Sequence, residues 1–222
     1  MRISEVFLSL QGEGTHVGIP TVFVRLQECN LRCAYPCDTP YALDPAGGEE
    51  MSVDEVMKRV RDFKKDGWVE ITGGEPLLQL KGVCALVQKL KYEGYFVEIE
   101  TNGSFDPPEW FRLVDSWNVD IKCPCSGPAY GSFKRRWLKR LRKRDALKFV
   151  VGTQEDLNFV RGLLSGAKLR PTILISPMLP SSHISDVLMS PWLQEVWDFC
   201  VRNNFRWSFQ QHKLAWGNLR GV

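Results

Sequence analysis

The stretch Cys29-Asn-Leu-Arg-Cys33-Ala-Tyr-Pro-Cys37 carries three thiols and directly follows the apolar run at 21–26. Three thiolates this close together form a soft ligand set that suits an iron–sulfur cluster or zinc. A closed tetrahedral zinc site needs four protein ligands, and no fourth cysteine lies near in the sequence. Three protein ligands leave one metal position open, which is typical of a site that reacts.

Other interpretations of these cysteines start from ordinary protein chemistry. The chain has seven cysteines, an odd number, and its 222 residues are enough to fold without a disulfide scaffold. A zinc site that takes Cys123, Cys125 or a histidine as its fourth ligand is the main alternative. A chance group of reduced thiols is a weaker one. We favour the iron–sulfur interpretation because of the close spacing.

Length and composition describe one globular domain over 1–222, with 44% apolar and 25% charged residues. The net charge of +3 is too small to indicate a nucleic-acid partner. No apolar stretch is long enough for a membrane span, and the first residues lack the pattern of an export signal. Together with free cysteines, these features predict a cytoplasmic protein with no nucleic-acid or membrane partner.

Segments with strand-like and helix-like periodicity alternate along the chain, and Ser52 and Glu55 form a capping box before the first helix. The alternation predicts an α/β fold with a mostly parallel sheet. It has too few units for a closed eight-unit barrel, so a partial barrel and a doubly wound sheet both remain. Strands are expected at 3–10, 21–26, 68–72, 96–101, 119–122, 147–151, 172–176 and 205–211. Helices are expected from Ser52 to Gly67, from Pro76 to Leu90, at 110–114, around Trp137, at 156–164 and at 191–201.

Polar and small residues gather at the predicted C-terminal ends of these strands. In a parallel sheet those ends share one face, which is where ligand sites form. We therefore expect one site built from Arg25 with the cysteine loop, 72–75, 100–102, 120–122, 176–178 and His212.

Motifs in order along almost the whole chain resemble the radical S-adenosylmethionine (SAM) superfamily and, within it, the 7-carboxy-7-deazaguanine synthase family. The superfamily features are the cysteine triplet, Gly-Gly-Glu-Pro at 73–76 and Glu-Thr-Asn-Gly at 100–103. The family features are Leu10-Gln-Gly-Glu-Gly14, Arg25, Cys-Asp-Thr39, Thr72, Asp120-Ile-Lys-Cys-Pro124, Ser176-Pro-Met178 and Gln211-His-Lys213. The resemblance implies a partial, incomplete TIM-like βα barrel of the radical SAM type.

The resemblance also implies cofactors and a reaction. Cys29, Cys33 and Cys37 would hold a 4Fe-4S cluster, whose electron cleaves SAM to methionine and a 5′-deoxyadenosyl radical. The radical would abstract hydrogen from C6 of 6-carboxy-5,6,7,8-tetrahydropterin. Ring contraction and loss of ammonia would then give 7-carboxy-7-deazaguanine, a precursor of queuosine and other deazapurines. Thr39 would meet a Mg²⁺ ion that bridges to the substrate.

The same resemblance assigns residues to each ligand. SAM would be contacted by Tyr35, Pro36, Asp38, Gly73, Gly74, Glu75, Glu100, Asn102, Lys122, Ser176, Pro177 and Met178. The substrate would be contacted by Leu10, Gln11, Gly12, Glu13, Arg25, Thr72 and His212. Without the resemblance, Arg25 fits an ordinary salt bridge as well as a substrate carboxylate, and a lone histidine more commonly lines a core.

The cysteine spacing departs from the superfamily pattern C-x3-C-x2-C, because this chain has C-x3-C-x3-C. Pro36 stands directly before Cys37. Tyr35, which resembles the residue that stacks on adenine, stands one place earlier. The added residue either bulges out and leaves all three thiolates on one cluster, or it displaces Tyr35. Pro36 also argues against a helix through the triplet, so we expect an irregular loop.

A basic segment at 134–144 carries apolar residues at helical spacing, which predicts an amphipathic helix with a solvated basic face. This face could also dock an acidic flavodoxin- or ferredoxin-type electron donor. The resemblance further implies a homodimer. Two other functions remain open: another radical SAM enzyme, such as an activase that makes a glycyl radical, and a non-enzymatic scaffold that holds zinc.

Overall fold

The computed structural model describes residues 1–166, 170–179, 190–217 and 219–221. Its strands form one sheet in the order β3-β1-β2-β4-β5-β6-β7-β8-β9. Strand β1 is antiparallel to β2 and β3, and all other neighbouring strands are parallel. Within the described residues the edge strands β3 and β9 do not pair with each other, so the barrel is open. The predicted mostly parallel α/β sheet and partial barrel are therefore confirmed.

The helices and strands follow the predicted alternation. The strands are β1 (Arg2–Leu10), β2 (Pro20–Leu26), β3 (Glu49–Glu50), β4 (Trp68–Gly73), β5 (Phe96–Thr101), β6 (Ser116–Ile121), β7 (Ala146–Val151), β8 (Thr172–Pro177) and β9 (Arg206–Trp207). The α-helices are α1 (Val53–Phe63), α2 (Leu80–Tyr92), α3 (Arg136–Arg140), α4 (Gln154–Leu164), α5 (Pro191–Asn203) and α6 (Gln211–Trp216). The 3-10 helices are η1 (Pro40–Ala42), η2 (Pro76–Gln79), η3 (Glu109–Leu113) and η4 (Pro124–Ala129).

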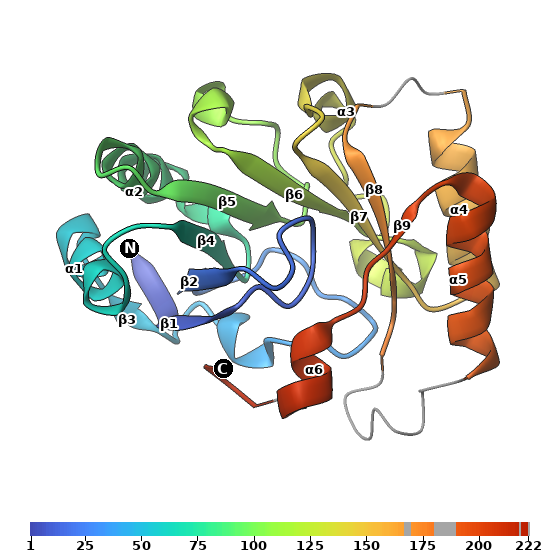
Figure 1. Cartoon of the computed structure of the whole chain (residues 1–222), viewed down its shortest axis with the longest axis horizontal. Coiled ribbons are helices and arrows are strands. Elements are labelled where there is room, and N and C mark those ends of the chain that lie inside the picture. The colour runs from blue at the N-terminus through green and yellow to red at the C-terminus, as the bar shows by residue number, and fades with distance from the viewer. Residues whose placement is uncertain (167–169, 180–189, 218, 222) are drawn as a thin grey trace.

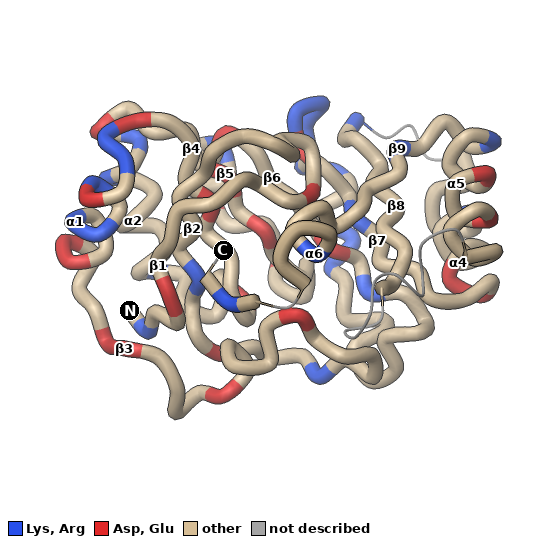
Figure 2. The backbone as a smooth tube through the Cα atoms, turned by 60° about the horizontal axis from the view of Figure 1, so that its bottom comes forward, with Lys and Arg blue, Asp and Glu red and all other residues tan. Residues whose placement is uncertain are grey.

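Helices cover one face of the curved sheet and leave the other face for the site. Helix α1 packs on β1 and β2, α2 on β5, α4 on β7, and α5 on β8 and β9. Among the described α-helices, α6 lies apart from the others, on the opposite, concave side, beside the loops that follow β1 and β2 (Figure 1). Helix α1 carries both acidic and basic segments on its outer surface (Figure 2). None of the helices in the described part of the chain is long and apolar enough to cross a membrane.

The strands alternate between an apolar face under the helices and a polar concave face, as the period of two in a strand requires. The core face is made of fully buried apolar side chains, including Val69, Ile71, Val97, Ile99, Trp117, Val119, Leu147 and Phe149. The residues between them are buried but polar: Glu70, Thr72, Glu98, Asn118, Asp120 and Lys148. The concave face of the sheet therefore carries buried polar and charged side chains on the strands themselves.

Helix starts follow local signals, whereas some predicted elements are shorter than expected. Ser52 forms the predicted capping box with Glu55, although α1 ends at Phe63, before Gly67. The predicted helix at 110–114 is a 3-10 turn, η3. The basic helix is only α3, about one and a half turns. The Trp137 indole N–H donates to the Phe105 carbonyl, and the backbone becomes extended at Leu141, which ends the helix.

The predicted strand at 205–211 is also shorter, since only Arg206 and Trp207 pair with β8. The chain leaves the sheet after Ser208, whose N–H makes a last bond to the Ile175 carbonyl. It then starts α6 at Gln211, so His212 lies on a helix rather than at the end of a strand. This correction brings His212 over the concave face.

A buried ion pair joins the start of β7 to β6. The Asp145 side chain is fully buried and accepts bonds from the Trp117 N–H at 3.1 Å, the Arg142 N–H at 2.6 Å and the Arg142 guanidinium at 2.8 and 2.9 Å. Arg142 also donates to the Val114 carbonyl and stacks over the Phe111 ring. One carboxylate therefore satisfies donors from β6 and from the loop that precedes β7.

We expect Asp145→Asn to lower the free energy of unfolding by about 3 kcal/mol, because the amide group would face a donor and leave Arg142 unpaired. The matched control is Asp106→Asn, which breaks the exposed pair with Arg136 and should cost no more than about 0.5 kcal/mol. Urea unfolding followed by tryptophan fluorescence measures both. Equal losses for the two variants would contradict the role given to Asp145.

Candidate active site

A cavity of about 600 Å³ opens on the concave face, between the loops after β1 and β2, the ends of β4 to β7, and α6. This volume is in the range of small-molecule sites. All but three of the predicted site residues line it: Leu10, Gln11, Gly12, Glu13, Arg25, Cys29, Cys33, Tyr35, Pro36, Cys37, Asp38, Thr39, Thr72, Gly73, Gly74, Glu100, Asn102, Lys122, Met178 and His212. Ser176, Pro177 and Glu75 are buried beside or behind it.

The loop with the three cysteines, residues 29–37, has no helix or strand, as Pro36 predicts. All three thiols are free and partly buried. The Leu31 N–H and the Asn102 side-chain amide donate to the Cys29 sulfur at 3.5 and 3.8 Å. Burial raises the pKa of the Cys29 and Cys33 thiols. All three cysteines line the same cavity.

The three thiols are the ligand set of a 4Fe-4S cluster. Among the described residues, no three Cys, His, Asp or Glu side chains converge in a way that would hold one metal ion. A 4Fe-4S cluster does not need this convergence, because each thiolate binds a different iron. Cys123 and Cys125, the candidate fourth zinc ligands, do not line the cavity within the described chain, and their thiols point at the Ile121 and Val150 carbonyls.

The cysteine loop is fixed to the ends of β4 and β5. The Glu75 N–H donates to the Glu28 carbonyl at 2.8 Å, and the backbone of Gly74 passes so close that a Cβ there would lie 2.0 Å from the Glu28 oxygen. Only glycine fits this approach. Tight contact between two backbones thus sets the height of the cysteines above the sheet.

Glu75 lies behind the cavity wall as a buried connector. Its carboxylate accepts bonds from the Leu77 N–H at 2.9 Å, the Thr101 hydroxyl at 2.8 Å and the Asn102 N–H at 2.8 Å. Burial raises the pKa of Glu75 to about 7, although the Asn102 and Leu77 amides favour the charged form. Glu75 touches the site through Asn102, which in turn contacts Cys29 and Asn30.

Ion pairs between buried side chains line the concave face. Lys148 binds Glu13 at 2.7 Å and Glu100 at 2.9 Å. Burial by itself would lower the pKa of Lys148, but Glu100 and Glu13 outweigh it and raise the pKa well above its usual value. Lys148 therefore stays charged and holds Glu100 in the cavity wall.

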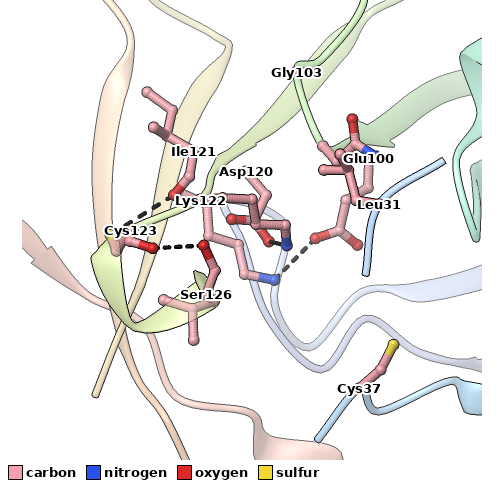
Figure 3. Close-up of polar contacts among 12 residues, drawn as sticks. Leu31, Cys37, Glu100, Gly103, Asp120, Ile121, Lys122, Cys123 and Ser126 are labelled. Atoms are coloured by element: carbon pink, nitrogen blue, oxygen red, sulfur yellow. Dashed lines mark hydrogen bonds and ion pairs between the residues drawn. The ribbon is translucent and has the colours of Figure 1, made fainter. Parts of the chain in front are cut away.

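Lys122 occupies the end of β6, next to the cysteine loop. It binds Asp120 at 2.8 Å and the Tyr35 hydroxyl at 3.3 Å. Figure 3 shows Lys122 and Asp120 facing the space that Glu100 and Cys37 border, with Cys123 on the other side of the strand end. Tyr35 is thus held against the sheet despite the added residue in the triplet.

Helix α6 closes the cavity on the side opposite the sheet. Lys213 and Gln210 bind the two oxygens of Asp38 at 2.6 and 2.7 Å, next to Cys37 in the chain. The ring of His212 lies directly over Gly12, where a Cβ would be 2.3 Å from Nδ1. Burial lowers the pKa of His212. The imidazole therefore faces the cavity in its neutral form at neutral pH.

Sequence reasoning gave no ligand contact to several cavity residues, Glu70, Asp120, Lys148, Gln210 and Lys213, although Asp120 lies in the expected segment 120–122 and Lys213 in the motif at 211–213. The first three alternate with apolar residues along buried strands, for example Val69-Glu-Ile71 and Leu147-Lys-Phe149. A polar residue between two core residues of a central strand faces the other side of the sheet, so this alternation was the available signal. The pairing of Gln210 and Lys213 with Asp38 spans most of the chain and has no local signal.

Known proteins similar to this chain show its family. The Radical SAM superfamily matches residues 24–121. The 7-carboxy-7-deazaguanine synthase of Pyrobaculum aerophilum is 38% identical, over 100% of this chain and 97% of that protein. The 7-carboxy-7-deazaguanine synthase of Thermoplasma acidophilum is 40% identical, over 100% of both chains.

A solved structure supports the fold independently of these sequences. The crystal structure of QueE from Escherichia coli has a TM-score of 0.72 with this chain, at 24% identity, and covers 95% of this chain and 94% of that one. This similarity fits the open, mostly parallel sheet described above. With relatives well above 30% identity over its full length, this chain belongs to the 7-carboxy-7-deazaguanine synthase family of the radical SAM superfamily.

Proposed function

We propose that the chain converts 6-carboxy-5,6,7,8-tetrahydropterin to 7-carboxy-7-deazaguanine with loss of ammonia. The observation that carries this proposal is one continuous cavity. Its lining includes both the three cysteines and the residues expected to bind the pterin. The atoms balance without an external oxidant, because the product is the substrate less ammonia. The hydrogen first removed from C6 is therefore returned, and SAM is regenerated.

Membership in the radical SAM superfamily implies a 4Fe-4S cluster and SAM. We assign the cluster to Cys29, Cys33 and Cys37, which are free and border one space. Bound together, the cluster and SAM supply the radical that starts the reaction. The protein's part is to position the two ligands and to keep water from the space between them.

SAM lies, in this proposal, along the ends of β4 to β6. The backbone of Gly73 and Gly74 faces its methionine part. Glu100 accepts hydrogen bonds from its hydroxyl groups, and the Asn102 amide can both donate and accept. Tyr35, held by Lys122 at 3.3 Å, offers a ring for the adenine. The predicted contact from Glu75 becomes an indirect one, because its carboxylate is buried behind Asn102.

The pterin lies between the sheet and α6. Glu5 binds Nε of Arg25 at 2.7 Å, which aims the rest of the guanidinium for a carboxylate. His212 and Gly12 form one wall and Thr72 another. Mg²⁺ would bind the Thr39 hydroxyl and substrate oxygens, since this ion takes few protein ligands. The only contact of that hydroxyl among the described residues is the Cys37 sulfur at 3.7 Å.

An acidic flavodoxin- or ferredoxin-type protein would supply the electron. The basic segment begins beside the cysteine loop, since the Lys134 N–H binds the Gly103 carbonyl at 2.9 Å and Ser104 binds Asn30 at 2.9 Å. Its exposed cations are Lys134, Arg135, Arg136, Lys139, Arg140, Lys143 and Arg144. Complementary charge would bring the donor close to the cluster.

We also propose that the chain acts as a homodimer in the cytoplasm. Large apolar side chains outside the cavity lining are exposed on β1 and on α6: Leu8, Leu214 and Trp216. A second copy would cover such a patch. A reducing cytoplasm would keep the cysteines free and the cluster intact.

An anaerobic assay tests the proposed reaction. Reconstituted protein given SAM, Mg²⁺, dithionite and the tetrahydropterin should form 7-carboxy-7-deazaguanine, detected by mass spectrometry. Cys33→Ala should form none and should bind less iron and sulfide. Cys84→Ala, which changes a thiol on α2 outside the cavity, is the matched control and should retain full activity. Cleavage of SAM without deazaguanine in the wild type would refute the substrate assignment.

Charge reversal tests the docking surface. We expect Arg135→Glu, Arg136→Glu and Lys139→Glu together to slow flavodoxin-driven turnover about tenfold or more at low salt, because steering is lost. Dithionite-driven turnover should not change. Reversal of the exposed Lys58, Lys65 and Lys81 near α1 and α2 is the control and should change neither rate. The docking proposal fails if both triple variants behave alike with flavodoxin.

A further inference from the structure

One buried carboxyl group on the cavity floor has no role in the function proposed above. Glu70 lies in the middle of β4, is 3% exposed and lines the cavity between Gln11, Arg25 and Thr72. Its neighbour in the sheet register is Glu98 of β5. Glu98 pairs with His16 at 2.6 Å and is not among the described residues that line the cavity. Glu70 therefore faces the ligand space and Glu98 does not.

Glu70 fixes the orientation of the Gln11 side chain. The Glu13 N–H donates to Gln11 Oε1 at 3.2 Å, and Gln11 Nε2 donates to Glu70 Oε2. A backbone N–H can only donate, so the Gln11 atom that faces it must be the oxygen. The amide nitrogen of Gln11 is thereby directed to Glu70, with its second hydrogen still free for a ligand.

The second oxygen of Glu70 is available. Among the described residues, Glu70 has no other hydrogen-bond partner and no ion-pair partner. The nearby cations are paired elsewhere: Lys148 with Glu13 and Glu100, and Arg25 with Glu5. Burial and the nearby Glu100, Glu98 and Glu13 raise the pKa of Glu70 well above its usual value. A buried acid whose second oxygen has no protein partner needs a further donor from elsewhere.

The floor thus offers a donor and an acceptor side by side, Gln11 Nε2–H and Glu70 Oε1. The pyrimidinone ring of a pterin carries the complementary pair, an oxo group next to a ring N–H. We propose that Glu70 is a specificity-determining residue, which accepts the ring N–H of the substrate while the Gln11 amide it holds donates to the neighbouring oxo group. This proposal rests on the function proposed above, and it assigns the floor of the cavity to the ring that the reaction leaves intact.

Binding without turnover tests it. Reconstituted, unreduced protein with SAM is titrated with 6-carboxy-5,6,7,8-tetrahydropterin in a calorimeter. Glu70→Gln should weaken binding roughly 10- to 100-fold, because its amide group would turn a donor toward the ring N–H. Glu70→Asp keeps the acid but withdraws it by one methylene, so it should lose less, and it replaces Glu70→Gln if that variant does not fold.

Glu98→Gln is the matched control, since it makes the same substitution on the adjacent strand at a residue that does not line the cavity within the described chain. It should bind the pterin within about threefold of wild type. Formation of 5′-deoxyadenosine from SAM without substrate should be the same in all variants. If the wild type binds and Glu70→Gln and Glu70→Asp bind equally well, this inference is overturned and the proposed function stands. An equal loss in Glu98→Gln also overturns it. A wild type that does not bind the pterin overturns both.

Discussion

The buried carboxylate of Glu75 joins three parts of the site that are far apart in the sequence. It accepts donors from η2, from Thr101 and from Asn102, while its own N–H binds the Glu28 carbonyl directly before the cysteine loop. Each bond crosses from the end of one strand to another element. Because Glu75 has 0% exposure, no water can replace a lost partner. The position of the cysteines over the sheet therefore depends on this carboxylate together with the close backbone approach at Gly74.

The charged side chains of the concave face are held by ion pairs. Burying charges is costly unless each has a partner. Here Lys148 is paired with Glu13 and Glu100, Lys122 with Asp120 at the same strand end, and Arg25 with Glu5 of the neighbouring strand. These pairs hold polar groups in fixed directions before any ligand arrives, which is what a site that positions two ligands needs. Stability of this face comes instead from the apolar layer on the other side of the same strands.

The sequence predicted the open α/β sheet because strand and helix periods alternate clearly, and it predicted most of the cavity because motifs follow the ends of parallel strands. It did less well where tertiary contacts decide. The segment at 205–211 has strand-like composition, but the chain leaves the sheet where Gln210 meets Asp38. The basic helix is cut short where Arg142 turns to Asp145. Asp38 is far in sequence from the segment at 205–211. Asp145 is close to the basic helix, but no local pattern reveals its burial.

For the site, too, the sequence predicted which residues take part, whereas tertiary contacts decide how their side chains are held. Tyr35 and Cys37 could be named from the triplet, although only the contact with Lys122 shows how the longer loop holds Tyr35. Glu75 was correctly placed at the end of β4, yet its carboxylate points away from the cavity, into the space between strand ends. Sequence indicates the strand end on which a residue lies, whereas the direction of its side chain follows from the donors that surround it.

Iron and sulfide content of Glu75→Gln after anaerobic reconstitution is the measurement that tests this account most directly. Three donors surround the carboxylate, so the amide group of the variant would face at least one of them. We predict less than half of the wild-type cluster in a variant that still folds, and full cluster in Glu70→Gln, which removes a buried acid that does not contact the cysteine loop. Full cluster in Glu75→Gln would contradict the claim that this carboxylate holds the cysteines in place.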